Sequence, residues 1–445
     1  MHSHQRSRLS AVLVAIAACL ALPTQAADWP QWRGPDRTAQ STETGLLDAW
    51  PEGGPALAWH VEGLGAGYSS VAIADGRIFT LGDIGDDQFV FALDATDGRQ
   101  LWRQKTGGKW ECQYGFHGSR STPTIDGDRL YALDSDGNLS AYATADGRRI
   151  WHRNLPKDFG GKLMNDLWAW SESPLIDGDH VIVAPGGPEA ALVALDKATG
   201  ETVWQATMPA LGEKGADGAG FSSAIISHAA GVKQIVQLFG RGVAGFDAAT
   251  GEFLWGYNGV ANHIANIPTP VAAGDYVFAS TSYDTGTALL HITRDEETGK
   301  VSAEEVYFLK PDTMQNHHGG FVLLDGVIYT GNGHNKGFPL AIEMKTGEIL
   351  WGPVRNEGKG SAAVAYVDGH LIYRYQSGHV VLIEANPKAY VQKGVFELPE
   401  LVKESWPHPA IADGKLYLRE NDHLWVYDLK QAPTPQPAEE DDKAR

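Results

Sequence analysis

Cysteine and long apolar runs are scarce in this chain of 445 residues. The two cysteines, Cys19 and Cys112, are too few for paired CxxC zinc ligands, and no CxxCH motif for haem attachment is present. The longest apolar run, residues 11–22, is too short to cross a bilayer as a helix. These absences exclude a structural zinc module, a covalently attached haem and a membrane-spanning segment.

Basic residues are also few, with 36 Lys and Arg against 55 Asp and Glu, for a formal net charge of -19. Such an excess of carboxylates repels a phosphate backbone, and no run of Lys or Arg compensates for it. The sequence therefore excludes nucleic acid as a partner, and it contains no basic helix for a membrane surface.

Residues 1–26 have the three parts of an export signal: two arginines, an apolar run and a small-residue cleavage site ending at Ala26. The pattern predicts a periplasmic or secreted protein. A loose lipobox around Cys19 leaves a lipid anchor as the alternative. Cleavage after Ala26 removes Cys19 and leaves Cys112 alone, so the mature chain has no intramolecular disulfide.

A unit of 43 to 53 residues recurs eight times. Within each unit, short apolar runs alternate with Gly and Asp turns, which indicates antiparallel strands rather than helices. Four strands in about 50 residues is the size of a propeller blade. The sequence predicts an all-β, eight-bladed β-propeller. Its turn glycines are Gly76, Gly127, Gly178, Gly231, Gly274, Gly326, Gly369 and Gly414.

The ends of the repeat predict how the ring closes. The eighth unit stops at residues 425–428 without its last strand, and a matching strand stands at residues 55–59. N- and C-terminal strands should therefore share the last blade, within a ring over residues 50–430. Residues 27–49 form an aromatic arm expected to pack over one face, and residues 431–445 form a Pro-rich acidic tail expected to be disordered.

Most units also carry a tryptophan shortly after a Thr-Gly or Asp-Gly pair, and its indole should fill the wedge between neighbouring blades. The fifth unit lacks this tryptophan at residues 298–301. The docking residues are Trp102, Trp151, Trp204, Trp255 and Trp351.

The pattern Ala-x-Asp-x-x-Thr-Gly-x-x-x-Trp, clearest at residues 192–204, 244–255 and 341–351, resembles the pyrroloquinoline-quinone (PQQ) type of propeller repeat. Known branches of that family include quinoprotein alcohol dehydrogenases and a scaffold lipoprotein of outer-membrane protein assembly. The resemblance implies the propeller fold and an exported bacterial protein, and it leaves the activity open.

The dehydrogenase branch implies PQQ held with calcium, through a Glu, an Asn and a nearby catalytic Asp. The counterparts here are Glu189, either Asn262 or Asn266, and Asp284. That branch also carries two adjacent cysteines, whereas Cys112 stands alone. PQQ with calcium is therefore the alternative cofactor hypothesis, and no other cofactor is predicted.

The segments that enter the innermost strands should converge on one mouth of the central channel and offer a polar ligand site with aromatic walls. The alternative is that their Ser, Thr and Pro residues only end strands, and that Arg120 and Glu172 pair with each other. No spacing indicates a metal site, because the adjacent His317 and His318 should point opposite ways on an extended segment. The candidate ligand residues are Tyr68, Arg120, Glu172, Asn266, His317, His318, Trp406 and His408.

The sequence thus favours a module that binds a small-molecule ligand or an envelope protein partner at this rim. The alternative is a PQQ-dependent dehydrogenase that oxidises alcohols or sugars with an external electron acceptor. A third class is a hydrolase or lyase that uses a rim histidine and a carboxylate as acid and base. No catalytic residue can be assigned from the sequence.

Overall fold

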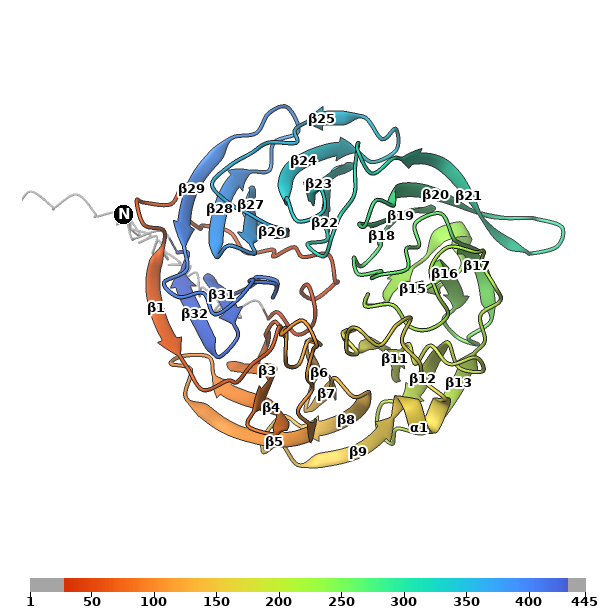
Figure 1. The fold of residues 1–445 in the computed structure, drawn as a ribbon, viewed down its shortest axis with the longest axis horizontal. Coiled ribbons are helices and arrows are strands. Elements are labelled where there is room, and N and C mark those ends of the chain that lie inside the picture. The colour runs from red at the N-terminus through yellow and green to blue at the C-terminus, as the bar shows by residue number, and fades with distance from the viewer. Residues whose placement is uncertain (1–27, 431–445) are drawn as a thin grey trace, which may run out of the picture.

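The computed structural model describes residues 28–430, which form eight four-stranded antiparallel sheets arranged around a central axis (Figure 1). The predicted eight-bladed propeller is confirmed. The predicted export signal and acidic tail lie outside the described residues. We number each sheet as a blade in chain order.

The strands of each blade follow one another from the axis outward. Blades 1 to 4 consist of β2 (Ala72–Ala74), β3 (Arg77–Ile84), β4 (Asp87–Asp94) and β5 (Gln100–Gly108); β6 (Thr124–Asp126), β7 (Arg129–Leu133), β8 (Asn138–Ala143) and β9 (Arg149–Asn154); β10 (Leu175–Asp177), β11 (His180–Val183), β12 (Leu192–Asp196) and β13 (Thr202–Ala206); and β14 (Ile225–Ser227), β15 (Gln234–Phe239), β16 (Gly242–Asp247) and β17 (Phe253–Tyr257).

The other half of the ring repeats this order. Blades 5 to 8 consist of β18 (Val271–Ala273), β19 (Tyr276–Thr281), β20 (Gly286–Arg294) and β21 (Val301–Leu309); β22 (Phe321–Leu324), β23 (Val327–Asn332), β24 (Phe338–Glu343) and β25 (Ile349–Trp351); β26 (Ala362–Val367), β27 (His370–Tyr375), β28 (His379–Glu384) and β29 (Gln392–Glu397); and β30 (Ala410–Ala412), β31 (Lys415–Glu420), β32 (His423–Asp428) and β1 (Ala56–Val61).

Helix is rare in the described part of the chain. It contains one short α-helix, α1 (Leu155–Phe159), and one 3-10 turn, η1 (Ala229–Gly231). Asn154 caps α1 by accepting a hydrogen bond from the backbone N–H of Lys157 at 3.0 Å. Both helical pieces lie in connections between strands, so the ring itself is built from β-sheets.

Blade 8 joins the two ends of the ring. β1 pairs antiparallel with β32, with Leu57 opposite Tyr427 and Val61 opposite Leu424. The predicted closure by N- and C-terminal strands is therefore confirmed, and Figure 1 shows β1 at the outer edge of this blade.

The turn glycines lie in the tight turns that follow the innermost strands, as the repeat predicts. All eight have φ between 54° and 84°, the left-handed region where a side chain is strained. Each innermost strand therefore runs through the channel and turns back at the same mouth, so the segments that enter these strands gather at the opposite mouth.

Aromatic side chains join neighbouring blades. The indole N–H of Trp102 donates to Thr144 O at 3.0 Å, and a Cβ on Gly147 would lie 2.6 Å from the same ring. Trp151 donates to Lys197 O at 3.1 Å. In blade 5, which lacks the predicted tryptophan, the Tyr307 hydroxyl donates to Met344 O of blade 6 at 2.7 Å. A tyrosine further along the strand thus takes over the docking contact.

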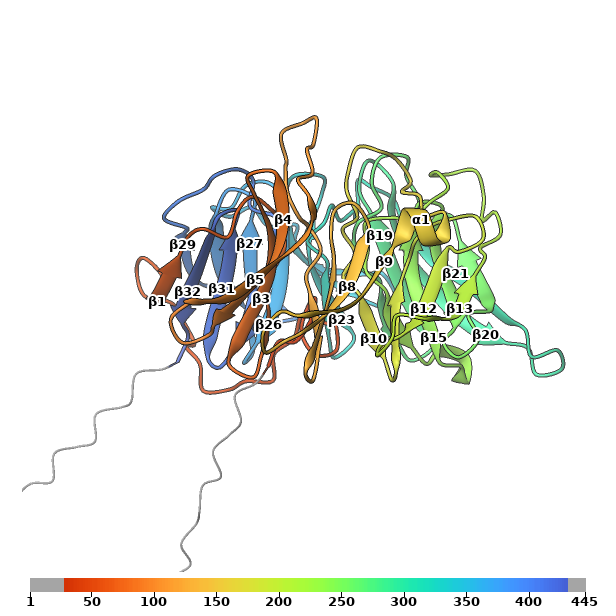
Figure 2. The same cartoon turned by 90° about the horizontal axis from the view of Figure 1, so that it is seen from below.

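The arm, residues 28–49, crosses the mouth at which the innermost strands turn back, and we call this the covered mouth. Figure 2 shows the red N-terminal chain along that side of the ring. Trp29 pairs with Ile73 of blade 1, and Pro30 O accepts from the backbone N–H of Ile125 in blade 2 at 2.8 Å. The arm therefore begins on the innermost strands themselves.

Arg37 fixes the centre of the arm. Its guanidinium donates to Ser173 O at 3.1 Å, to Pro174 O and to Ala224 O at 2.9 Å, so it joins blades 3 and 4. Later in the arm, Gln40 donates to Leu323 O of blade 6 at 3.0 Å. These contacts close the covered mouth with well-partnered polar groups.

Candidate functional site

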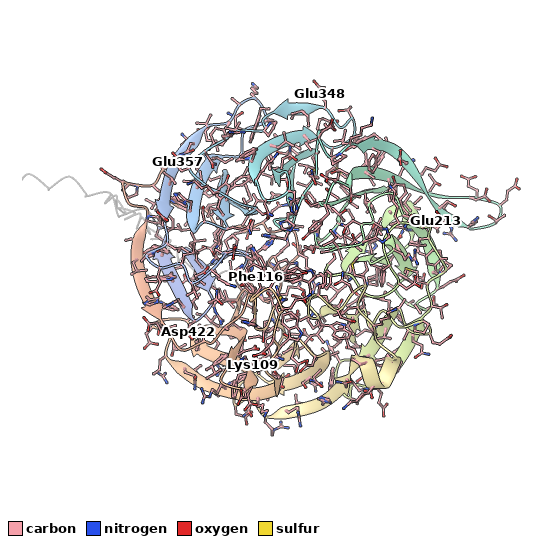
Figure 3. All side chains as sticks on the ribbon, in the orientation of Figure 1. Lys109, Phe116, Glu213, Glu348, Glu357 and Asp422 are labelled. Atoms are coloured by element: carbon pink, nitrogen blue, oxygen red, sulfur yellow. The ribbon has the colours of Figure 1, made fainter. Side chains whose placement is uncertain are left out.

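The opposite, open mouth leads into a cavity of about 910 Å³. Its walls come from connections between consecutive blades and from turns within blades 5, 6 and 7, and its lining includes Trp32 and Arg33 of the arm. The loop after β5 rises above this mouth in Figure 2, and Figure 3 places Phe116 of that loop over the central part of the ring. The channel is therefore a pocket that opens at one end.

One wall of the cavity is an arginine among aromatic rings. The Arg120 guanidinium carbon lies 5.0 Å from the ring centre of Tyr68 and 5.2 Å from that of Trp110. It lies 5.3 Å from Trp168 and 5.7 Å from Trp406. Cation–π attraction holds a guanidinium at such distances. We call these five residues the arginine box.

Arg120 has few polar partners. Its Nη2 donates to Phe116 O at 2.6 Å, whereas its Nε is buried without a hydrogen-bond partner in the described chain. Burial lowers the pKa of Arg120 to about 10, so the guanidinium is charged at neutral pH. A buried cation with an unpartnered donor is suited to an anionic ligand.

Glu172 does not neutralise this cation. Its Oε1 accepts from the backbone N–H of Ala184 at 2.8 Å, and its carboxyl group faces the charge of Arg37. Burial raises the pKa of Glu172 to about 8 against these two favourable contacts. The pairing of Arg120 with Glu172 that the sequence left open is not present, and Glu172 lies outside the cavity lining.

Asn266 is likewise fully buried away from the lining. Its amide donates to Phe239 O and Gly240 O, each at 3.0 Å, and its Oδ1 accepts from the N–H of Asn262 at 3.0 Å. The side chain therefore secures the connection between blades 4 and 5. Tyr68, Arg120, His317, His318, Trp406 and His408 do line the cavity.

Histidines form a second wall. The rings of His317 and His318 lie 4.7 Å apart, and His334 lies 4.7 Å from His317. The expectation that His317 and His318 point opposite ways is wrong, because the chain bends at these residues instead of running extended. Hydrogen bonds join His317 to Ser361 at 2.8 Å and to the Tyr283 hydroxyl at 3.0 Å.

His318 and His408 lie next to each other in this wall. His408 Nε2 donates to His318 O at 3.0 Å, while His408 Nδ1 and His318 Nε2 have no partner in residues 28–430. Burial lowers the pKa of both to about 3, so both rings are neutral near pH 7. These two nitrogens are therefore buried polar atoms without a partner within residues 28–430.

The arm supplies the floor of the cavity. The Trp32 ring lies 4.3 Å from His408, and its indole N–H donates to Thr269 at 3.2 Å. Arg33 donates to Phe321 O, and its Nε and Nη1 are buried without a partner in the described chain. Neither residue was among the predicted ligand residues, although a Trp-Arg pair in a segment without strand period was a signal that this arm enters the ring.

The lining is cationic in an acidic chain. It contains Arg33, Arg120, Lys359 and Lys403 against the single carboxylate of Glu404. Lys403 lies over the Phe116 ring at 4.5 Å from its centre and donates to Gly115 O at 2.6 Å. Lys403 and Phe116 were not predicted from the sequence, because they come from connections without repeat signal. The aromatic content of residues 110–117 was the available clue.

The residues that would hold calcium beside PQQ do not come together. Glu189 and Asp284 are exposed and outside the cavity lining. Asn262 uses its Oδ1 to accept from the backbone of Ala265 at 2.7 Å, and Asn266 is bonded as described above. Cys112 is buried near Leu167 O and has no second cysteine beside it. These residues do not fit the dehydrogenase arrangement.

No helix within residues 28–430 has the length and apolar character needed to span a membrane.

Solved structures of an assembly factor and of a dehydrogenase are similar to this chain. Among solved structures, BamB from Moraxella catarrhalis is similar with 15% identity and a TM-score of 0.58, over 84% of this chain and 99% of that one. The quinohemoprotein alcohol dehydrogenase from Comamonas testosteroni is similar with 13% identity and a TM-score of 0.61, over 92% and 82%. At such identities the likeness shows the fold alone.

A curated relative, tetrathionate hydrolase from Acidithiobacillus ferrooxidans, is 24% identical over 314 residues. The match covers 58% of this chain and 56% of that protein, so the chain spans about half the length of the curated relative.

The family model described as outer membrane protein assembly factor BamB matches residues 34–169 and 164–353, which is most of the ring. With its eight blades and its PQQ-type repeats, the chain belongs to this PQQ_2 family.

Proposed function

We propose that the protein is an exported binding module that takes an anionic small molecule with a flat face into the cavity of the open mouth. The carrying observation is the arginine box, a charged guanidinium among four aromatic rings with its Nε unpartnered among the described residues. An aromatic wall stacks on a planar ligand, and the guanidinium bonds an anionic group on it.

The charge around the box supports the anionic class. Four basic side chains and one acidic one line the cavity, although the whole chain has 19 more acidic than basic residues. A cavity of about 910 Å³ with an apolar wall and a few polar groups is of the size and kind that holds small ligands. The curated relative is named for an anionic substrate, tetrathionate, which agrees with this class.

A pair of matched ligands tests the proposal. Naphthalene-2-carboxylate and its neutral carboxamide have the same flat face and differ in charge. Tryptophan fluorescence reports binding, because Trp32, Trp168 and Trp406 line the cavity. We expect the carboxylate to bind at least tenfold more tightly than the amide, a difference of about 1.4 kcal/mol.

Substitution of the cation provides the control. Arg120→Met should abolish the preference for the carboxylate. Arg153→Met should retain it, because Arg153 also lies over an aromatic ring, 4.6 Å from the centre of Phe159, but outside the cavity. Equal binding of carboxylate and amide by the unaltered protein would contradict the proposal.

A protein partner is the second candidate, and a different observation favours it. Of the eight exposed large apolar side chains among the described residues, Leu401 and Val402 line the open mouth, and Tyr114 and Ile264 come from the same connections as the lining residues Phe116 and Ala265. Exposed apolar groups on a polar rim are typical of protein-binding surfaces. The family description, an outer-membrane assembly factor, is in keeping with this role.

Introducing an acidic side chain on the rim tests this second candidate. Val402→Asp should reduce co-purification of the protein with an envelope partner. Leu57→Asp should not, because Leu57 is equally exposed but lies on β1 at the outer edge of the ring. Equal co-purification of both variants would count against the rim as the docking surface.

The quinone-dependent alternative loses support in the structure, because Glu189 and Asp284 lie outside the cavity. Addition of PQQ and calcium, followed by the absorption spectrum and the melting temperature, tests it directly. A spectral change with dye-linked alcohol oxidation would restore this hypothesis.

A further inference from the structure

Two histidines and a glutamate meet where the ring closes, on the outer side of blade 8 and apart from the cavity. His60 lies on β1 and His423 on β32, the strands that come from opposite ends of the chain. His60 Nε2 and His423 Nδ1 are 3.1 Å apart, and Glu62 Oε1 lies 3.9 Å from His423 Nδ1. One ligand atom from each residue lies within 4.8 Å of the others.

This spacing suits a small divalent metal ion. Zinc binds imidazole nitrogen and carboxylate oxygen at about 2.1 Å in tetrahedral geometry, which places neighbouring ligand atoms about 3.4 Å apart. The two nitrogens already have nearly this separation, and the Glu62 carboxylate is 64% exposed and free to move closer. Glu62 directly follows the last residue of β1, two positions after His60, which keeps its carboxylate within reach of both imidazoles.

The surroundings hold the imidazoles in place. The His60 ring stacks on Trp425 at 3.6 Å with an angle of 12° between the planes. The second nitrogen of His423, Nε2, lies 3.8 Å from Glu400 Oε1. Metal-binding histidines usually have a carboxylate or carbonyl group at their other nitrogen, which orients the ring. Glu400 occupies that place for His423.

We propose that His60, Glu62 and His423 bind a divalent transition-metal ion, with zinc as the best match, and that the ion ties β1 to β32. Three protein ligands leave a fourth position for solvent, as in sites of the two-His, one-carboxylate type. Since His60 and His423 are 363 positions apart, the ion would link the two ends of the folded ring. Binding to the folded state alone stabilises it by mass action.

Zinc titration of the full chain, purified without a polyhistidine tag and treated with chelator, tests the proposal. We expect one tightly bound ion per chain and a rise in melting temperature, while magnesium and calcium have neither effect because they prefer oxygen ligands. Cobalt should give the visible spectrum of a tetrahedral site. The absence of a bound ion would overturn the proposal.

Variants separate this site from the other histidines. His60→Ala should lose the bound ion and the melting shift, and Glu62→Gln, at an exposed position, should fold normally and bind at least tenfold more weakly. His334→Ala is the matched control, because His334 belongs to the histidine wall of the cavity. Loss of the ion in His334→Ala with retention in His60→Ala would place the metal in the cavity and overturn the assignment.

Discussion

Arg37 at the covered mouth and Arg120 at the open mouth are both cations within the ring, and they differ in what surrounds them. Arg37 donates to the carbonyl oxygens of Ser173, Pro174 and Ala224. Arg120 donates to one carbonyl oxygen and otherwise meets aromatic faces. A fully partnered guanidinium joins parts of the fold, whereas a partly partnered one retains capacity for a ligand.

The largest effect should follow from removal of the partnered cation. Arg37→Met removes the guanidinium donor of Ser173 O, Pro174 O and Ala224 O, of which Pro174 O keeps the Thr124 hydroxyl as a second donor, and buried acceptors without partners are costly. We expect a loss of about 3–5 kcal/mol in the free energy of unfolding, measured by denaturant titration. A loss below about 1 kcal/mol would show that the two mouths do not differ as described.

The second largest effect should come from lowering the pH, because two histidines at the open mouth are held in the neutral form. Burial lowers the pKa of His318 and His408 to about 3, from 6.5 in an unperturbed histidine. Between these values the unfolded chain binds protons that the folded chain excludes, so the free energy of unfolding is fully present above pH 6.5 and falls as the pH drops toward 3. The slope is at most about 1.4 kcal/mol per pH unit for each residue.

Denaturant titrations at pH 7.5, 6 and 5 measure this slope. His318→Gln and His408→Gln should each make it shallower. Glu172 supplies a contrast of opposite sign, because burial raises its pKa to about 8 and the folded chain keeps the proton between pH 4.5 and 8. Its contribution is therefore lost as the pH rises from 4.5 to 8, so Glu172→Gln should make the fall in unfolding free energy toward acid steeper, whereas the histidine substitutions make it shallower.

Arg120→Met should have a smaller effect on stability than Arg37→Met. The substitution gives up one hydrogen bond and the cation–π contacts, but it also removes a desolvated charge. We expect the free energy of unfolding to change by less than about 1 kcal/mol. A loss as large as that of Arg37→Met would make Arg120 part of the fold and weaken the proposed ligand site.

Trp32 belongs to both mouths, since it extends from the arm and lines the cavity, and its substitution should likewise have only a small effect on stability. Trp32→Phe keeps an aromatic ring near His408 but loses the hydrogen bond to Thr269. We expect a loss of about 1 kcal/mol in unfolding free energy. The melting temperature measures this loss. Trp32→Ala, which removes the whole aromatic ring, should lower the melting temperature further and serves as the comparison.

The contrast between the mouths also separates what the sequence could predict from what it could not. Blade number, closure by β1 and β32, and the docking of Trp102 and Trp151 all follow from spacing, because each repeat imposes the same turn and wedge. Tyr307 makes the docking contact in place of the missing tryptophan. This contact could not be predicted, because Tyr307 stands outside the repeat position.

The site was less predictable than the ring. Six of the eight candidate residues line the cavity, since the residues that enter the innermost strands converge at one mouth whatever their chemistry. Glu172 and Asn266 enter at the same place, but their side chains bond to backbone groups of blades 3 and 4. The floor residues Trp32 and Arg33 came from a segment without period, whose path depends on tertiary contacts alone.

The arm and β1 also determine when the molecule can finish folding. Glu43 accepts from the N–H of Gly414, 371 positions later, and β1 finds its partner only in β32. The arm and β1, although made early, therefore have no complete docking surface until nearly the whole chain is available. Contacts of such sequence separation form slowly. We expect the arm and β1 to settle last, so that the cavity gains its floor only at that step.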